Sequence, residues 1–116
     1  MESLFSKENC LSQHQWGTGC HSWNFVDTDA LSVKQELMPP NAVERLHYHK
    51  HATQFFFVLS GTAIFVVDGQ VTLVNPQQGI EIRPGQKHRI SNHAETDLEF
   101  ILYSHPSTKN DRIDCE

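Results

Sequence analysis

The sequence has no uninterrupted run of about 18 apolar residues, so it encodes no transmembrane helix. It also has no CxxC pair among Cys10, Cys20 and Cys115, which leaves zinc ribbons and thioredoxin-type redox motifs without support. The first residues lack a basic segment followed by an apolar run, so we expect no secretory signal. Three unpaired cysteines without such a signal fit a reducing compartment, and we expect a cytoplasmic protein.

Positive charge is also scarce, because 9 Lys and Arg stand against 14 Asp and Glu, for a net charge of −5. That balance argues against a nucleic-acid or anionic-membrane partner. The 116 residues suffice for one domain. Histidine is the abundant type, with 8 residues, nearly as many as Lys and Arg together. This excess fits a pH-sensitive device, a metal site or chance.

Short apolar runs with period-two alternation and no helical period indicate an all-β fold, a sandwich or a barrel. Turn residues separate the runs, and Asp68-Gly69 is a strong hairpin signal. From residue 21 onward the sequence is typical of strands, and the strands with clear bounds are expected at 31–38, 43–49, 54–60, 62–67, 70–74, 80–83, 87–91 and 98–104. We divide the chain into an N-terminal arm (1–20), a β-barrel domain (21–105) and a polar C-terminal tail (106–116).

One cluster of histidines has the spacing of metal ligands. His47 and His49 are two residues apart, so on a strand they point to the same side, about 6.7 Å apart along its axis. His88 follows a Pro84-Gly85 turn on another expected strand, and neutral imidazoles bind transition metals. An H-x-H pair alone also occurs on solvated strand edges, so the spacing by itself leaves the metal open.

Two segments resemble a known family. Residues 47–61 read H-x-H-x4-Q-x6-G, and residues 83–92 read x-P-G-x2-H-x3-N. They are similar to the two motifs of the cupin superfamily, in particular its small single-domain (type-2) members, over roughly residues 31–104. The resemblance implies a jelly-roll β-barrel of two packed antiparallel sheets, with a divalent transition metal at its mouth. Fe, Mn, Ni, Zn and Cu all remain open. The implied ligands are His47, His49, Gln54 and His88.

The sequence departs from the family pattern at several positions. Gln54 stands where the family has Glu, so the site loses a charge, and we expect weaker divalent binding and a more Lewis-acidic metal. Asn41 replaces the leading Gly of the first motif, since Asn tolerates turn geometry. In the second motif Arg83 holds the Pro position, and Gly79 is two residues closer than the pattern asks, which shortens a loop.

The remaining polar candidates receive simpler interpretations. We expect His51 at the rim of the site rather than as a ligand, and His93 on the surface. Glu36 and Glu44 are acid–base candidates only if they face the pocket, and solvated surface positions are preferred. Phe56 and Phe100 are candidates for the pocket mouth. No Ser or Cys pairs with a His in a nucleophile motif, so the catalytic residues stay unknown.

Three functions are compatible with these residues. The first is a metal-dependent enzyme acting on a small organic metabolite, with dioxygenase- or isomerase-like Lewis-acid chemistry. The second is a non-catalytic barrel that binds or senses a small molecule with weak or no metal. The third is an oligomeric structural barrel, because the resemblance implies a homodimer and the N-terminal segment carries Trp16, Trp23 and Phe25. Since metal binding needs neutral imidazoles, we expect affinity to fall as pH drops through about 6.5.

Overall fold

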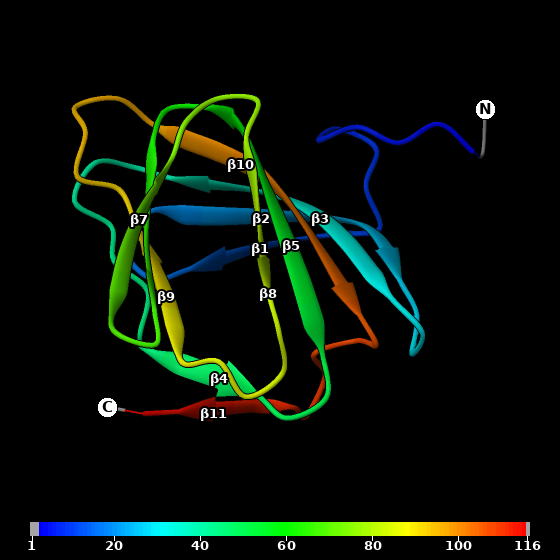
Figure 1. Cartoon of the computed structure of the whole chain (residues 1–116). Helices are drawn as coiled ribbons and strands as arrows, with labels where there is room; N and C mark the ends of the chain where they lie inside the picture. The colour runs from blue at the N-terminus through cyan, green and yellow to red at the C-terminus, as the bar shows by residue number, and fades with distance from the viewer. Residues whose placement is uncertain (1–2, 116) are drawn as a thin grey trace.

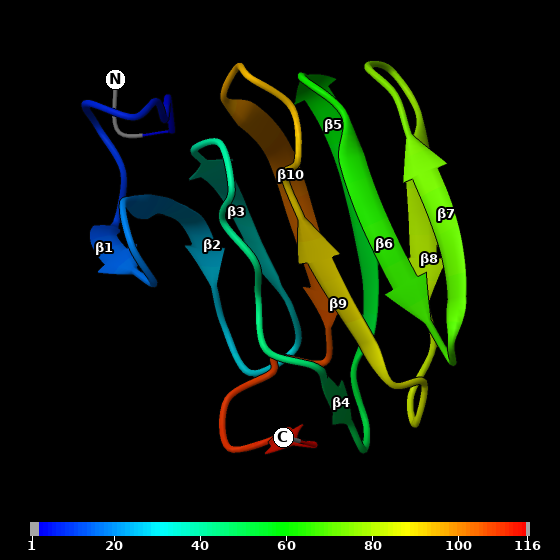
Figure 2. The same ribbon diagram turned by 90° about the vertical axis from the view of Figure 1, so that its left-hand side faces the viewer.

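The computed structural model describes residues 3–115, which form two antiparallel sheets packed face to face (Figures 1 and 2). One sheet has six strands in the order β1-β2-β3-β10-β5-β8, and the other has five in the order β11-β4-β9-β6-β7. The strands are β1 (Ser12–Trp16), β2 (Cys20–Asp27), β3 (Ser32–Met38), β4 (His47–His49), β5 (Thr53–Ser60), β6 (Ala63–Val67), β7 (Gln70–Val74), β8 (Gly79–Ile82), β9 (His88–Ser91), β10 (Leu98–His105) and β11 (Arg112–Asp114). The predicted all-β jelly roll is confirmed. Within residues 3–115, no helix is long and apolar enough to cross a membrane.

The turns that shape the barrel use residues able to take a positive φ. Asp68 and Gly69 (φ 49° and 82°) join β6 to β7 in the hairpin that the sequence predicts. Gly61 has φ 82°, and a Cβ there would lie 2.6 Å from the carbonyl oxygen of Asp97, so only glycine fits. Asn41 adopts φ 70°, which agrees with its expected role in place of a turn glycine.

The space between the sheets is apolar at one end. There the buried core includes Met38, Val58, Ala63, Phe65, Val74, Ile90, Leu98 and Phe100. Phe56 lies at the boundary, with its ring 5.0 Å from Phe65 and 5.7 Å from Phe100 between centroids.

Toward the other end, the same inward faces turn polar. On β10 the buried residues run from Leu98 through Phe100 to Ser104, and on β5 Gln54 precedes Phe56 on the inward side. The barrel interior thus has a hydrophobic core at one end, which stabilises the fold, and a polar chamber at the other end, which contains the histidines.

Two strands lie in segments where the sequence predicted no regular structure. Residues 12–16 form β1 and pair with β2 at the edge of the six-stranded sheet. Residues 112–114 form β11 and pair with β4, which bears two of the histidines (Figure 1). Both strands are short and mostly polar, which hides them in the sequence. The partner of β11 also lies far away in the chain, whereas β1 forms a hairpin with β2.

Candidate metal centre

Three histidines converge where the two sheets meet. His47 and His49 project from β4, and His88 projects from β9, where it stands directly opposite His47 in the strand register. One nitrogen of each ring lies within 4.8 Å of the others, and all three residues are buried. Strand geometry therefore brings together the imidazoles that the sequence predicted to converge.

Each of these imidazoles is oriented by the backbone. Nδ1 lies 2.7 Å from the carbonyl oxygen of Arg45 in His47, 3.2 Å from that of Asp111 in His49, and 2.9 Å from that of Gln86 in His88. A carbonyl oxygen only accepts, so Nδ1 carries the proton in every ring. The opposite nitrogen, Nε2, is left with a free lone pair, which is the arrangement of metal-binding histidines.

Gln54 enters the same chamber from the opposite sheet. Its Nε2 donates to Oγ of Ser104 at 3.1 Å, which fixes the amide and turns Oε1 away from Ser104. That oxygen is buried without a hydrogen-bond partner in the described chain, as are Nε2 of His49 and Nε2 of His88. Buried polar atoms are rarely left unpaired in folded proteins, and three at one point fit a site built for a cation.

The donor set suits a transition metal. Imidazole nitrogen and amide oxygen bind Zn, Fe, Mn, Ni and Cu. The hydrogen bond from each Nδ1 to a backbone carbonyl keeps the three rings from rotating. The residues that would hold a metal are therefore His47, His49 and His88, with Gln54 Oε1 available as a neutral fourth ligand.

Burial sets the charge of the three imidazoles. It lowers the pKa of His47 and of His88 to about 4, and it also lowers the pKa of His49. Hydrogen bonds to the backbone carbonyls oppose this shift without cancelling it. All three rings are neutral at pH 7, the form that coordinates a metal.

Asp111 fastens the loop that follows the H-x-H motif. Its carboxylate accepts backbone N–H bonds from Lys50 (2.9 Å), His51 (3.1 Å) and Ala52 (3.0 Å). Burial works to raise the pKa of Asp111, but these three donors outweigh it and leave that pKa lowered. The carboxylate thus locks the loop between the ligands on β4 and Gln54 on β5.

The two glutamates expected on the surface lie in the chamber instead, which corrects the sequence interpretation. On β3, Glu36 stands opposite Phe100 and lies on the inward face of the strand. The other face of β3, which carries Val33 and Leu37, is the more apolar one and therefore resembles a core face in the sequence. Glu44 reaches within 3.8 Å of His47 Nδ1 and 3.7 Å of the Arg112 guanidinium. Burial raises the pKa of Glu36, and it raises the pKa of Glu44 to about 8 against the opposing effect of Arg112.

A cavity of about 200 Å³ leads to the cluster. We call it the inner cavity, and its walls are Trp16, Lys34, Glu36, Glu44, His47, His49, Gln54, Phe56, Leu102, Thr108 and Arg112. Phe56 thus lines the pocket, as predicted, whereas Phe100 is fully buried in the core and does not line it. A small molecule entering this cavity would meet the imidazoles, two carboxyl groups and two cationic side chains.

The other histidines of the motifs lie apart from the cluster. His51 is exposed and is not one of the three converging rings, and His93 is exposed beyond Asn92. Asn92 itself is fully buried, and its amide donates to the carbonyls of Met38 and Thr96. Its position in the second motif therefore has a structural reason, since it joins the end of β3 to the segment that leads into β10.

Sequence reasoning missed Trp16, Asp111 and Arg112. Trp16 comes from the N-terminal segment, where β1 forms a hairpin with β2, whereas Asp111 and Arg112 come from the C-terminal segment, whose β11 pairs with the distant β4. The only local signal was the alternation in 111–114, which is too short to predict a strand.

Two packed antiparallel sheets with three inward imidazoles at one end define a small β-barrel protein with a candidate metal centre. Residues 35–104, more than half of the chain, match the family model described as the cupin domain. The chain belongs to the cupin family.

Sequence relatives carry this domain as a small part of a longer chain. The chain is 30% identical over 97 residues to the alginate biosynthesis protein AlgA of Pseudomonas fluorescens, covering 83% of this chain and 19% of that protein. It is 29% identical over 76 residues to a mannose-1-phosphate guanylyltransferase of Sinorhizobium fredii, covering 66% of this chain and 15% of that protein. The chain therefore spans less than a fifth of the length of these curated relatives.

Solved structures match the whole fold more completely. An uncharacterized conserved protein with a double-stranded beta-helix domain from Klebsiella pneumoniae superposes with a TM-score of 0.80 at 20% identity, covering 97% of this chain and 96% of that one. At these identities the likeness shows the shared fold.

Proposed function

We propose that this chain is a metal-dependent cupin enzyme that binds a divalent transition metal through His47, His49, His88 and Gln54 and acts on a small organic metabolite. The observation that carries the proposal is the set of buried, unpartnered atoms: Nε2 of His49, Nε2 of His88 and Oε1 of Gln54. When bound, the metal would supply Lewis-acid polarisation of a substrate oxygen.

The chain's own residues support proton transfer. Glu44 lines the inner cavity beside His47, and its raised pKa of about 8 keeps a proton on the carboxyl for much of the time near pH 7. A group whose pKa lies near the working pH can both take and return a proton. Glu36 lines the same cavity and has a raised pKa as well. This pair favours isomerase-like chemistry, in which a proton leaves one carbon and returns to another, over dioxygenase chemistry.

The neutral fourth ligand favours a second candidate, a barrel that binds or senses a metabolite without turnover. Gln54 brings no charge to the cation, so the metal would be held less tightly than by three histidines and a glutamate. The same cavity and the same glutamates would then orient a ligand without changing it.

Measuring the metal content of the purified protein tests whether the proposed ligands bind a metal. We would purify the chain, saturate it in turn with Mn, Fe, Ni and Zn, remove loose ions and measure metal per chain. Bound metal should approach one ion per chain, and His47→Ala should lose it. His51→Ala, which removes the exposed histidine of the same motif, is the matched control and should keep it. Equal uptake by the unchanged chain and by His47→Ala would refute the metal site.

Deuterium exchange then separates the enzyme from the binding barrel. The metal-loaded chain would be incubated in D₂O with a panel of small hydroxy and keto acids, and NMR would follow loss of the C–H signal next to the carbonyl. An isomerase-like site exchanges that hydrogen in at least one panel member, and Glu44→Gln slows the exchange. Binding of panel members without exchange in any of them would favour the non-catalytic barrel.

The state of the three cysteines supports a cytoplasmic location. Cys10, Cys20 and Cys115 form no disulfide. Free thiols persist in reducing compartments, and we propose that the protein works in the cytoplasm.

A further inference from the structure

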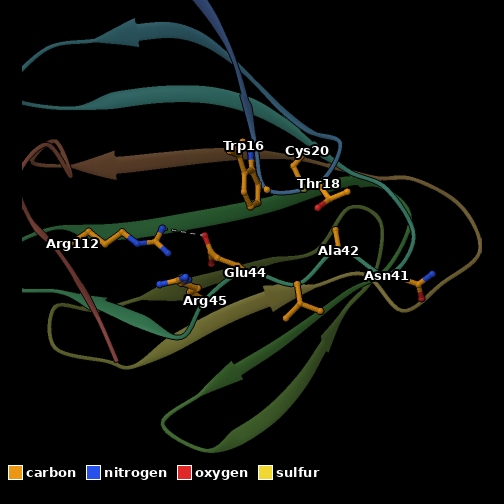
Figure 3. Close-up of a pocket in the computed structure, with 10 residues that line it drawn as sticks. Trp16, Thr18, Cys20, Asn41, Ala42, Glu44, Arg45 and Arg112 are labelled. Atoms are coloured by element: carbon orange, nitrogen blue, oxygen red, sulfur yellow. Dashed lines mark ion pairs between the residues drawn. The ribbon is translucent and has the colours of Figure 1, made fainter. Parts of the chain in front are cut away.

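A second, larger cavity adjoins the inner one. It has a volume of about 480 Å³ and lies between the start of the six-stranded sheet and the segment that precedes β4 (Figure 3). We call it the outer cavity. Trp16, Glu44 and Arg112 line both cavities, so these three side chains form the boundary between them. A molecule that reaches the histidines through the inner cavity therefore has room for a further group in the outer one.

Hydrogen-bond donors are concentrated at this boundary. The indole Nε1 of Trp16 is buried and has no partner within residues 3–115. In Figure 3 the Trp16 side chain descends from β1 toward Glu44, and Arg45 lies on the other side of Glu44. The guanidinium of Arg45 lines the outer cavity, and in the described part of the chain it makes no side-chain hydrogen bond and no ion pair.

Arg112 is the second cation of the outer cavity. Its Nε donates to Asp114 at 2.8 Å, and its Nη1 lies 3.7 Å from Glu44 Oε2, the contact drawn as a dashed line in Figure 3. A guanidinium has five N–H donors, so these two contacts leave others for a ligand. Among the residues that line the outer cavity, Arg45 and Arg112 stand against the one carboxyl of Glu44, so these walls carry an excess of positive charge.

We propose that the outer cavity binds an oxyanion, a carboxylate or phosphate group, through Arg45, Arg112 and the indole N–H of Trp16. Guanidinium groups bind both anions with paired, charge-assisted hydrogen bonds, and the buried indole N–H of Trp16 gains the acceptor that residues 3–115 do not provide. The substrate of the proposed enzyme would then be a small anion, with its anionic end in the outer cavity and its reacting end at the histidines. That second statement rests on the proposed function, whereas oxyanion binding itself needs no metal.

The test compares ligands that differ only in the anionic group. Gluconate and glucitol share one hydroxylated carbon chain and differ in the carboxylate, and glucose 6-phosphate and glucose differ in the phosphate. Binding would be measured by titration calorimetry on protein freed of metal with a chelator, which keeps the metal site out of the result. We expect at least one anion to bind about tenfold or more tightly than its neutral counterpart, and the pair that shows it identifies carboxylate or phosphate as the group recognised.

Variants locate the binding. Arg45→Gln is the cleanest change because that side chain makes no ion pair within residues 3–115, and it should weaken anion binding about tenfold. Trp16→Phe keeps the aromatic ring, removes the N–H and should weaken anion binding by a smaller factor. Arg83→Gln is the control of equal charge, since Arg83 is exposed, pairs with Glu81 and lines neither cavity.

Two results would overturn the proposal. One is that neither anion binds more tightly than its neutral counterpart. The other is that Arg83→Gln weakens binding as much as Arg45→Gln, which would mean attraction by overall charge. These outcomes are separate from the fate of the metal centre, because a chain that takes up no metal but binds an anion through Arg45 keeps the outer cavity site and loses only the proposed reaction.

Discussion

The backbone carbonyl of Asp111 accepts the Nδ1 proton of His49 at 3.2 Å, while the carboxylate of the same residue holds three backbone N–H groups of the loop that follows His49. One residue of the C-terminal segment thus orients a candidate metal ligand and anchors the chain beyond it. The link passes between positions 62 residues apart in the sequence. It makes the C-terminal segment part of the site.

Replacing Asp111 should weaken the fold and the metal site together. Asp111→Ala removes the acceptor for three buried or half-buried backbone donors, and we expect a loss of about 2–4 kcal/mol in the free energy of unfolding. Metal affinity should fall about tenfold, because the loosened segment would hold the Asp111 backbone carbonyl, which orients His49, less firmly in place. Urea unfolding and chelator competition measure the two effects.

The matched control for Asp111 lies on the next strand. Asp114 is on β11 and its carboxylate accepts from Arg112 at the surface. Asp114→Ala should leave the affinity for metal within about twofold and change stability little, because an exposed ion pair contributes little to folding. Equal losses in the two variants would contradict a specific role for Asp111.

The metal-free protein should lose stability in mild acid. The pKa of His47 and of His88 is about 4 in the folded chain and about 6.5 in an unfolded one, so between these values the unfolded chain binds more protons. The contribution of these two histidines to stability is therefore fully present above pH 6.5 and is lost as pH drops toward 4. Unfolding curves of metal-free protein at several pH values check this.

Two histidine variants serve as controls for the acid effect. His88→Gln should flatten the fall between pH 6.5 and 4, because it removes one of the buried imidazoles, while His51→Ala should retain the fall because that ring is exposed. The same lowered pKa values revise the sequence expectation for the metal. Protons compete with the metal less strongly than ordinary imidazoles allow, so occupancy should persist below pH 6.5 and fall nearer pH 4.

Much of the barrel could be predicted because most of its strands are recognisable from short stretches of sequence. Alternating apolar residues and turn pairs such as Asp68-Gly69 are short-range signals, and His47, His49 and His88 stand at fixed distances from such turns. The orientation of the three rings could not be predicted in the same way, because it depends on carbonyl groups of Arg45, Gln86 and the distant Asp111.

Glu36 shows where period-two reasoning fails. Alternation says which residues share a face, but it does not say which face is inside. On β3 the inward face carries Glu36 and Lys34 beside the polar chamber and Met38 at the apolar end, so polarity alone pointed to solvent. A strand that lines a functional cavity breaks the usual rule that the polar side is the outer side.

The N-terminal segment gives a prediction about assembly. Trp16 lines the cavities and Trp23 is buried with Lys7 over its ring at 4.5 Å, so these aromatic side chains pack within their own chain. Leu4, Phe5 and Leu11 remain exposed. We propose a homodimer held by these three side chains, and light scattering should give twice the 13.3 kDa chain mass.

The dimer proposal has a direct control. Changing Leu4, Phe5 and Leu11 together to Ser leaves β1 intact and should shift the mass to that of a monomer. Changing Val71 and Leu73, which are equally exposed on β7, to Ser should leave the dimer in place. A monomer mass for the unchanged chain, or a dimer that survives the first triple change, would contradict the proposal.

Gln54 decides how tightly the site holds a cation. Gln54→Glu would place a carboxylate where Oε1 now lies, and Ser104 Oγ, which accepts from the amide, would donate to it instead. A charge pair near 4 Å is worth up to about 4 kcal/mol at an effective dielectric of 20, so a gain in metal affinity of about tenfold or more is expected after losses to solvent.

The metal-free Gln54→Glu variant should unfold at a lower temperature than the unchanged chain, because a buried carboxylate without a cation is costly. Chelator competition and thermal unfolding measure both, with Gln70→Glu, the same charge change at an exposed position, as the control that should alter neither. Unchanged or weaker metal binding in Gln54→Glu would remove Gln54 from the ligand set and leave the three histidines alone.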